Sequence, residues 1–239
     1  MLLMKLHRLL LIIYMLGCCV WVAAQQRRVQ NKPFIDDRLF HYGFFVGLHD
    51  EALQLQNNGY IDPATGQQWV SSTDQTNVGF SVGVLGEWKL HRYVSLRAVP
   101  SLHFGSKHIT LRDLSTGNRE YQDMKSCYVG VPLDLKISAP RFNNYRPYVI
   151  AGLAPMYDLT TGKHEKLQVK PFTLMLEAGM GCDLYMPFFK FIPELKFCFG
   201  LGNVFKKKRN DLTDPSQMVY TQSIDRATVG MVVLSFYFE

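Results

Sequence analysis

The sequence predicts an all-β fold in which eight antiparallel strands close into a transmembrane barrel. Three observations point to this fold. Stretches of strict period-two alternation recur along the chain, as in β-strands whose two faces meet unlike environments. The connections between these stretches alternate between long and short. Beyond the N-terminal segment, no apolar run has the length of a spanning helix. A barrel with tight turns at one end and longer loops at the other has this pattern.

The clearest alternation is a hairpin from Val78 to Phe104. Its apolar face comprises Val78, Phe80, Val82, Val84, Trp88, Leu90, Val94, Leu96, Ala98, Pro100, Leu102 and Phe104. The opposite face is small, polar and charged. A soluble sandwich would bury the apolar face against a second sheet, whereas a membrane barrel would turn it to lipid. The alternating loop lengths favour the barrel, because a sandwich gives no reason for them.

The other strands are expected in order along the chain. They are placed at residues 39–48, 126–138, 147–157, 172–186, 191–201 and 224–239, the last with Val232, Leu234, Phe236 and Phe238 outward. Short turns are expected at 91–93, 140–144 and 187–189, and long loops at 49–77, 113–122, 158–170 and 203–223. Prolines inside strand runs cannot donate to the ladder, so they are expected near rims or bulges.

The chain divides into three expected segments. Residues 1–24 have a basic start, an apolar stretch and small residues before a cleavage site between Ala24 and Gln25, which indicates a secretory signal peptide. A membrane anchor is the alternative, but its apolar run is shorter than the ~20 residues that a spanning helix needs. Residues 25–38 form a polar periplasmic lead-in, and residues 39–239 form the barrel domain. An exported chain that spans with strands is expected in a bacterial outer membrane, with both termini periplasmic.

The inward faces of these strands collect charged side chains. They are Glu87, Lys89, Arg97, Asp134, Lys136, Glu177, Asp183, Glu194 and Lys196, together with neutral His103. Eight strands leave an interior wide enough only for side chains, and buried charges must pair. This near-balanced set predicts a salt-bridged network that fills the lumen. A conduction or proton path is the functional alternative, and it would favour an excess of one sign.

Other chemistry has weaker support in the sequence. Ser101 and His103 lie two apart on one strand face with Glu87 across the hairpin, the residue types of a hydrolase, but they face the lumen and are interpreted as structural. The basic run Lys206, Lys207, Lys208 and Arg209 lies in the last long loop and is a possible site for lipopolysaccharide phosphates or an acidic partner.

The cysteines have no metal or disulfide spacing, so no cofactor is expected. The net charge of +6 is too mild and dispersed to indicate nucleic acid.

Several stretches resemble a known family. They are the segment 32–48, with His41, Tyr42 and Gly43, the stretch 94–105, the motif Val129-Gly130-Val131-Pro132-Leu133, and the motif Arg146-Pro147-Tyr148-Val149-Ile150-Ala151-Gly152. Together they resemble PorT-type outer-membrane β-barrel proteins of the Bacteroidetes. This resemblance implies a component of the type IX secretion system, which exports proteins that carry a C-terminal sorting domain. It brings no catalytic residues.

Three functions are therefore weighed. The first is a non-enzymatic accessory role in type IX secretion, in contact with outer-membrane lipid, lipopolysaccharide and other secretion components, because so narrow a barrel cannot pass a folded cargo. The second is a general small barrel for envelope integrity or adhesion. The third is a lipid A-modifying enzyme that uses Ser101 and His103.

Overall fold

The computed structural model describes residues 30–63, 65–73, 78–160, 168–206 and 221–239. A short 3-10 helix, η1 (Ile35–Asp37), precedes eleven β-strands. The strands are β1 (Phe40–Asn57), β2 (Trp69–Ser72), β3 (Val78–Lys89), β4 (Val94–Ala98), β5 (Ser101–Asp113), β6 (Arg119–Gly130), β7 (Leu133–Ser138), β8 (Tyr145–Asp158), β9 (Phe172–Tyr185), β10 (Lys190–Gly200) and β11 (Ile224–Phe238). All of them belong to one sheet in which every pairing is antiparallel.

The sheet closes on itself as a barrel of eight strand positions. Starting from β1, the ring runs through β3, then β4 with β5, then β6 with β7, then β8, β9, β10 and β11, and β11 pairs again with β1. β2 lies outside this ring of positions and pairs with the distal part of β5. The predicted fold class, an antiparallel eight-stranded barrel, is therefore confirmed.

Two prolines explain why eleven strands make eight positions. Pro100 separates β4 from β5, and Pro132 separates β6 from β7, because neither residue has an N–H for the ladder. Their carbonyls still bond across the wall: Pro100 accepts from Val84 and Pro132 accepts from Val99. The pairing register continues unchanged past both interruptions. The expectation of rims or bulges was wrong for these two prolines, since both lie within the wall and neither shifts the register.

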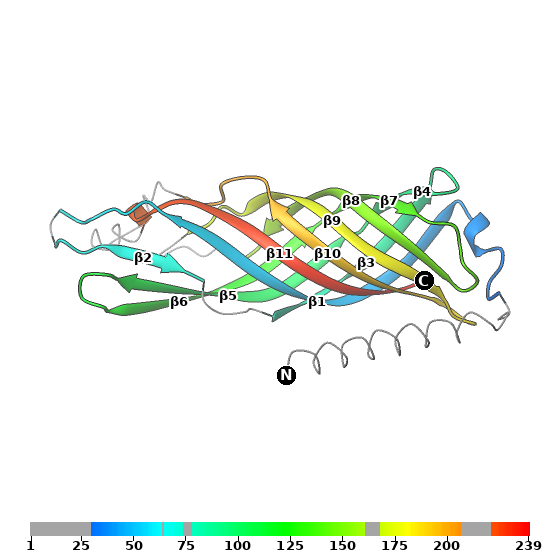
Figure 1. The fold of residues 1–239 in the computed structure, drawn as a ribbon, viewed down its shortest axis with the longest axis horizontal. Helices are drawn as coiled ribbons and strands as arrows, with labels where there is room; N and C mark the ends of the chain where they lie inside the picture. The colour runs from blue at the N-terminus through cyan, green and yellow to red at the C-terminus, as the bar shows by residue number, and fades with distance from the viewer. Residues whose placement is uncertain (1–29, 64, 74–77, 161–167, 207–220) are drawn as a thin grey trace, which may run out of the picture.

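The two ends of the barrel differ. One end, called here the short-turn end, holds the turns at 90–93, 139–144 and 186–189, the start of β1 and the C-terminus. The other end, called here the long-loop end, holds β2, the tip of the β5–β6 hairpin and the described parts of the longer connections (Figure 1).

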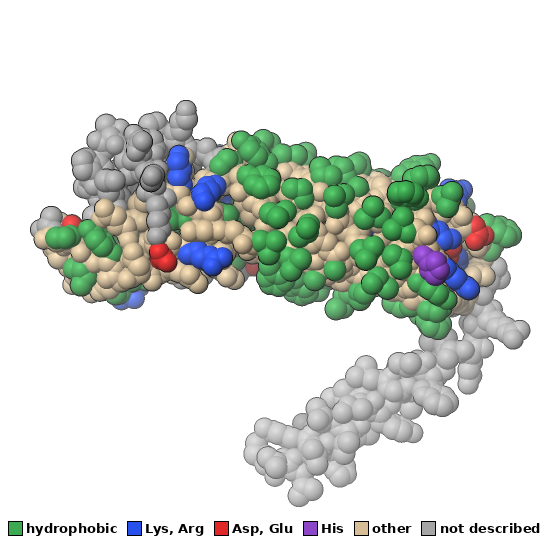
Figure 2. Space-filling view, turned by 90° about the horizontal axis from the view of Figure 1, so that it is seen from above, with side chains coloured by type: hydrophobic (Ala, Val, Ile, Leu, Met, Phe, Trp, Pro, Cys, Tyr) green, Lys and Arg blue, Asp and Glu red, His purple; other side chains and the backbone are tan. Residues whose placement is uncertain are grey.

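The outer surface carries an apolar band next to the short-turn end. Along β1, the outward residues Phe40, Tyr42, Phe44 and Leu48 are each at least 50% exposed. Figure 2 shows hydrophobic side chains gathered over this part of the barrel, while polar side chains and backbone cover the part toward the long loops. The residues predicted to face outward on the last strand, such as Leu234 (40% exposed), also lie on the outer surface of this apolar band. The band has the character of a lipid-facing surface.

The polarity of the wall reverses along β5. Near the short-turn end, Leu102 and Phe104 face outward while Ser101 and His103 are buried. Past Lys107 the inward positions become apolar, as at Ile109 and Leu111, and the outward positions become polar. The interior beyond the band is consequently a packed hydrophobic core. It contains Leu53, Ile109, Leu111, Met124, Met156, Met175, Val229 and Met231.

Because of this reversal, two segments that were predicted to be loops are partly strand. The first strand was expected to end at Leu48, but β1 continues to Asn57. Residues 113–122 were expected to be a loop, but β6 already begins at Arg119. In both places the strand continues, but its apolar residues now face inward instead of outward. The outward apolar pattern that was used to predict the strands therefore stops before the strands do.

Candidate functional site

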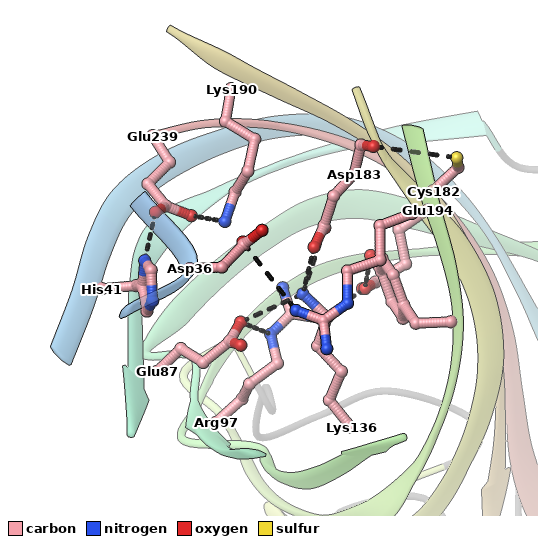
Figure 3. Close-up of polar contacts among 12 residues, drawn as sticks. Asp36, His41, Glu87, Arg97, Lys136, Cys182, Asp183, Lys190, Glu194 and Glu239 are labelled. Carbon is pink, nitrogen blue, oxygen red and sulfur yellow. Dashed lines mark hydrogen bonds and ion pairs between the residues drawn. The ribbon is translucent and has the colours of Figure 1, made fainter. Parts of the chain in front are cut away.

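The interior of the band holds a buried charged network centred on Arg97. Its guanidinium, on β4, is fully buried and lies 2.5 Å from Oε2 of Glu194 on β10 and 3.6 Å from Oε2 of Glu87 on β3. The hydroxyls of Tyr148 and Tyr237 donate to the same Glu194 carboxylate at 2.5 and 3.0 Å. Both tyrosine rings also face the guanidinium, at 5.7 and 4.8 Å. The network thus ties strands from opposite parts of the ring together (Figure 3).

Lys136 extends the network toward the short-turn end. Its ammonium, on β7, donates to both oxygens of Asp183 on β9, at 3.0 and 2.9 Å, and lies 3.3 Å from Glu87. Glu87 therefore joins Arg97 and Lys136, as Figure 3 shows. This shared carboxylate couples strands β3, β4, β7 and β9.

Lys196 forms the layer nearest the middle of the barrel. Its ammonium, on β10, lies 3.4 Å from Glu177, 3.9 Å from Glu194 and 4.0 Å from Asp134. Asp134 is fully buried, and neither of its oxygens accepts a hydrogen bond within the described residues. This carboxylate is the most weakly satisfied member of the network.

Glu239 completes the network at the short-turn end. Glu239 contacts Nδ1 of His41 on β1 at 2.5 Å and forms an ion pair with Lys190 on β10. The backbones of Lys190 and Glu239 also bond to each other in both directions. The last residue of the chain is thus held at the short-turn end between the first and the tenth strands (Figure 3).

The lead-in segment packs across this end. The Tyr185 hydroxyl donates to Oδ1 of Asp36 at 2.7 Å, and Arg141 and Arg146 pair with the same carboxylate at 3.5 and 3.8 Å. Lys89 donates to the Asp36 carbonyl. The Arg141 guanidinium lies 3.5 Å from the centroid of the Tyr185 ring. These contacts hold η1 over the mouth of the barrel.

A neutral layer and a second charged cluster follow toward the long loops. The Ser81 hydroxyl bridges Nδ1 of His49 and Nδ1 of His103, at 2.7 and 2.8 Å. Beyond it, the Lys107 ammonium lies 2.9 Å from Glu51 and donates to the Tyr128 hydroxyl at 2.6 Å. The apolar core begins above this cluster. In the described residues, the lumen is therefore filled by charged, neutral and apolar layers in turn.

The nine charged residues assigned to the inward face all lie inside or at the mouth. Eight of them are buried, and Lys89 is half-buried at the short-turn mouth. Sequence reasoning missed further buried charges, namely Glu51, Lys107, Asp158, Lys190 and Glu239. Continuing the period-two count past Leu48 and Gly105 would have found Glu51 and Lys107, because both keep the inward phase of their strands.

The alternative catalytic set does not assemble as its chemistry requires. Oγ of Ser101 lies 3.1 Å from Nε2 of His103, but the carboxylate expected to orient that histidine, Glu87, contacts Arg97 and Lys136 instead. His103 is held by Ser81 on its other nitrogen. Ser101 and His103 are both at least 95% buried, so a substrate would have to displace the packed interior to reach them.

The remaining expected sites lie partly outside the described residues. Lys206 is exposed after the short bridge between Val169 and Phe205, whereas Lys207, Lys208 and Arg209 lie outside the described residues. The cleavage site at Ala24 and Gln25 and the whole predicted signal peptide also lie outside them. Within the described ranges, no three His, Cys, Asp or Glu side chains come together to hold a metal ion.

No helix in the part of the chain that the structure describes is long and apolar enough to cross a membrane.

A closed antiparallel barrel with an apolar outer band and a charged, filled interior defines an outer-membrane β-barrel. The sequence supports this class directly. Residues 23–206 match the family model of the outer membrane protein beta-barrel domain, and the chain belongs to this family. It is an integral outer-membrane protein.

Solved structures with a similar fold are outer-membrane barrels at low identity. OprG of Pseudomonas aeruginosa is 11% identical with a TM-score of 0.45, and the match covers 83% of this chain and 92% of that one. The attachment invasion locus protein Ail of Yersinia pestis is 12% identical with a TM-score of 0.37, covering 82% and 96%. The outer membrane protein AlkL is 11% identical with a TM-score of 0.38, covering 90% and 94%. No curated protein sequence matches this chain.

Proposed function

We propose that this outer-membrane barrel is a non-enzymatic accessory component of type IX protein secretion. The proposal rests on the resemblance of the stretches 32–48, 94–105 and 146–152 to PorT-type proteins. The family match is consistent with this proposal, but it identifies only the broader class of outer-membrane barrels.

The observation that carries an accessory rather than a conducting role is the filled interior. The buried pairs of Arg97, Lys136 and Lys196 occupy the band, and the core around Leu111 and Met124 occupies the long-loop end. Eight strands leave room only for side chains. A polypeptide in transit would have to displace both layers, so the barrel acts through its two ends.

In this proposal both termini lie in the periplasm and the long loops face outward. Short turns on the periplasmic side and longer loops outside are the usual arrangement in such barrels. The lead-in held over the short-turn end by Asp36 would then meet periplasmic components. The exposed Lys206 at the opposite end would meet lipopolysaccharide phosphates.

The test is export of cargo in a deletion strain. Proteins that carry the C-terminal sorting domain are compared in culture medium and periplasm of wild-type, deleted and complemented cells. Loss from the medium with accumulation in the periplasm, restored by the full chain, supports the secretion role. Normal export in the deleted strain contradicts it.

A second candidate, adhesion or envelope integrity, is favoured by the extension beyond the band. The β5–β6 hairpin and β2 form a sheet past the apolar surface, with Tyr121 64% exposed on it. Normal export, combined with detergent sensitivity or lost attachment in the deleted strain, would select this function. Lipid A of unchanged acyl pattern in Ser101→Ala and His103→Ala strains is expected for either non-enzymatic role.

A further inference from the structure

A groove interrupts the outer wall of the band on strands β7 to β11. It has a volume of about 640 Å³ and is lined by outward apolar residues, among them Ile137, Val149, Met180 and Leu234. Such a volume is within the ~300–1,000 Å³ range of small-molecule sites. An apolar hollow in a lipid-facing surface takes an apolar occupant, because water in it would have no polar partners.

The groove exists because its floor has short side chains and an interrupted ladder. Gly181, Cys182 and Pro193 line it. The β9–β10 pairing passes from Phe191 with Leu184 to Glu194 with Gly181 and skips the residues between them. Pro193 has no N–H to donate there. The depression therefore belongs to the backbone as well as to the side chains.

A second hollow of about 300 Å³ lies at the short-turn end and is cationic. Lys89, Arg92, Arg141 and Arg146 line it, against the carboxylates of Asp36 and Asp37. Asp36 already pairs with Arg141 and Arg146. Arg92 is exposed, and its guanidinium lies 5.6 Å from the centroid of the Tyr93 ring. The hollow has more positive than negative groups and presents one of them to solvent.

The two hollows meet at the end of the band. Ala139 and Pro147 line the apolar groove, and their chain neighbours Pro140 and Arg146 line the cationic hollow. Ala139 and Pro140 are consecutive residues just past the end of β7, so the two hollows adjoin at the rim. Arg146 faces the opposite side of β8 from Pro147, because successive strand residues alternate, and it contributes to the cationic hollow from the mouth side of the wall. An occupant of both has an apolar tail and an anionic head.

We propose that these two hollows form one binding site for a phospholipid with an anionic headgroup, with its acyl chain against β7–β11 and its phosphate at the short-turn mouth. The site is independent of the secretion role. The site lies at the short-turn end, where η1 packs over the mouth of the barrel. The bound lipid would cover the outer side of the wall at that end.

The test uses the full chain in phosphatidylcholine vesicles that contain a small fraction of spin-labelled phosphatidylglycerol. The motionally restricted fraction of the label measures binding. Loss of Arg92 in Arg92→Gln is expected to weaken phosphatidylglycerol about fivefold relative to phosphatidylcholine, from the usual contribution of one cation near an anionic lipid. Arg38→Gln removes an exposed charge that does not line the hollow and is expected to change nothing.

Groove-filling variants test the tail. Ala139→Phe and Leu195→Trp fill the groove from opposite walls and are expected to abolish the restricted fraction. Ala151→Phe enlarges an outward residue on β8 that does not line it and serves as the control. Two filling variants keep the test decisive if one of them fails to fold.

Several results would overturn the proposal. Equal binding of phosphatidylglycerol and phosphatidylcholine would remove the headgroup assignment. Equal loss in Arg92→Gln and Arg38→Gln, or in Ala139→Phe and Ala151→Phe, would remove the site. Displacement of the label by inorganic phosphate alone, or a preference for lipid A over phosphatidylglycerol, would replace the phospholipid by another ligand.

Discussion

Replacing Arg97 by methionine tests whether the charged interior stabilises the barrel through specific pairs. Arg97 is fully buried, and its removal leaves the carboxylates of Glu194 and Glu87 without their guanidinium partner. Breaking a buried pair costs about 3–5 kcal/mol. Glu194 keeps the hydroxyl donors of Tyr148 and Tyr237, so we expect the lower end, about 3 kcal/mol. That is about two powers of ten in the unfolding equilibrium.

The assay is denaturant unfolding of the refolded protein in vesicles, followed by tryptophan fluorescence. A double-mutant cycle with Glu194→Gln isolates the pair. The double variant is expected to recover much of the lost free energy, because it no longer buries an unpaired charge. The exposed Arg38→Gln serves as the control and is expected to change stability by less than ~1 kcal/mol. A loss below ~1 kcal/mol for Arg97→Met, or additive single variants, would refute the reasoning.

Three further predictions concern packing and pH. Gly152→Ala would place Cβ 2.2 Å from a backbone oxygen of β7, so we expect a loss of about 1–3 kcal/mol, whereas Gly86→Ala, with its nearest atom at 3.7 Å, should be neutral in the same unfolding assay. Leu111→Ala empties a fully buried position in the apolar core and should cost about 2–5 kcal/mol; a loss under ~1 kcal/mol would mean that the core collapses around the gap. Beyond the band, the Thr116 hydroxyl donates to Asp113 and lowers the pKa of that carboxyl below 3.8. The contribution of this contact is present above pH 3.8 and is lost as the pH falls through the lowered pKa, so the turn at 114–118 should loosen only in strong acid. Amide chemical shifts of that turn measure this, and Asp113→Asn should remove the dependence on pH.

Much of the fold was predictable because each strand repeats the same simple rule. Alternation alone assigned the inward face to Arg97, Lys136 and Glu194, and all three are buried. Alternation does not reveal partners, since pairing across the lumen depends on how far each strand is staggered against the next. Arg97 on β4 meets Glu194 on β10 from four strand positions away, across the ring of eight, and no local spacing encodes that contact.

The parts that sequence reasoning missed are those where the rule changes phase or ceases. Lys107 lies just past Gly105, where the apolar residues change faces, so the inward assignment stopped before it although the strand continues to Asp113. Asp36 lies in an aperiodic segment, and its contacts with Tyr185 and Arg141 come from the packing of η1 on the mouth. Glu239 follows the alternating run of β11, and alternation does not reveal that it pairs with Lys190 and His41.

The reversal of polarity along β5 also makes insertion depth a property of the sequence. If the barrel moved along the membrane normal toward its long-loop end, Phe104 would enter water; if it moved toward its short-turn end, the exposed pair of His108 and Asp123 would enter hydrocarbon. Such a transfer costs little at the interface and rises to about 2–4 kcal/mol for a basic side chain at the midplane. The outward residues of β1 change in the same way between Leu48 and Gln54. The reversal therefore marks, on both strands, the boundary between the lipid-facing and the water-facing parts of the wall. The protein should therefore keep a constant vertical position, and the height of the hairpin above the surface should not vary with lipid composition.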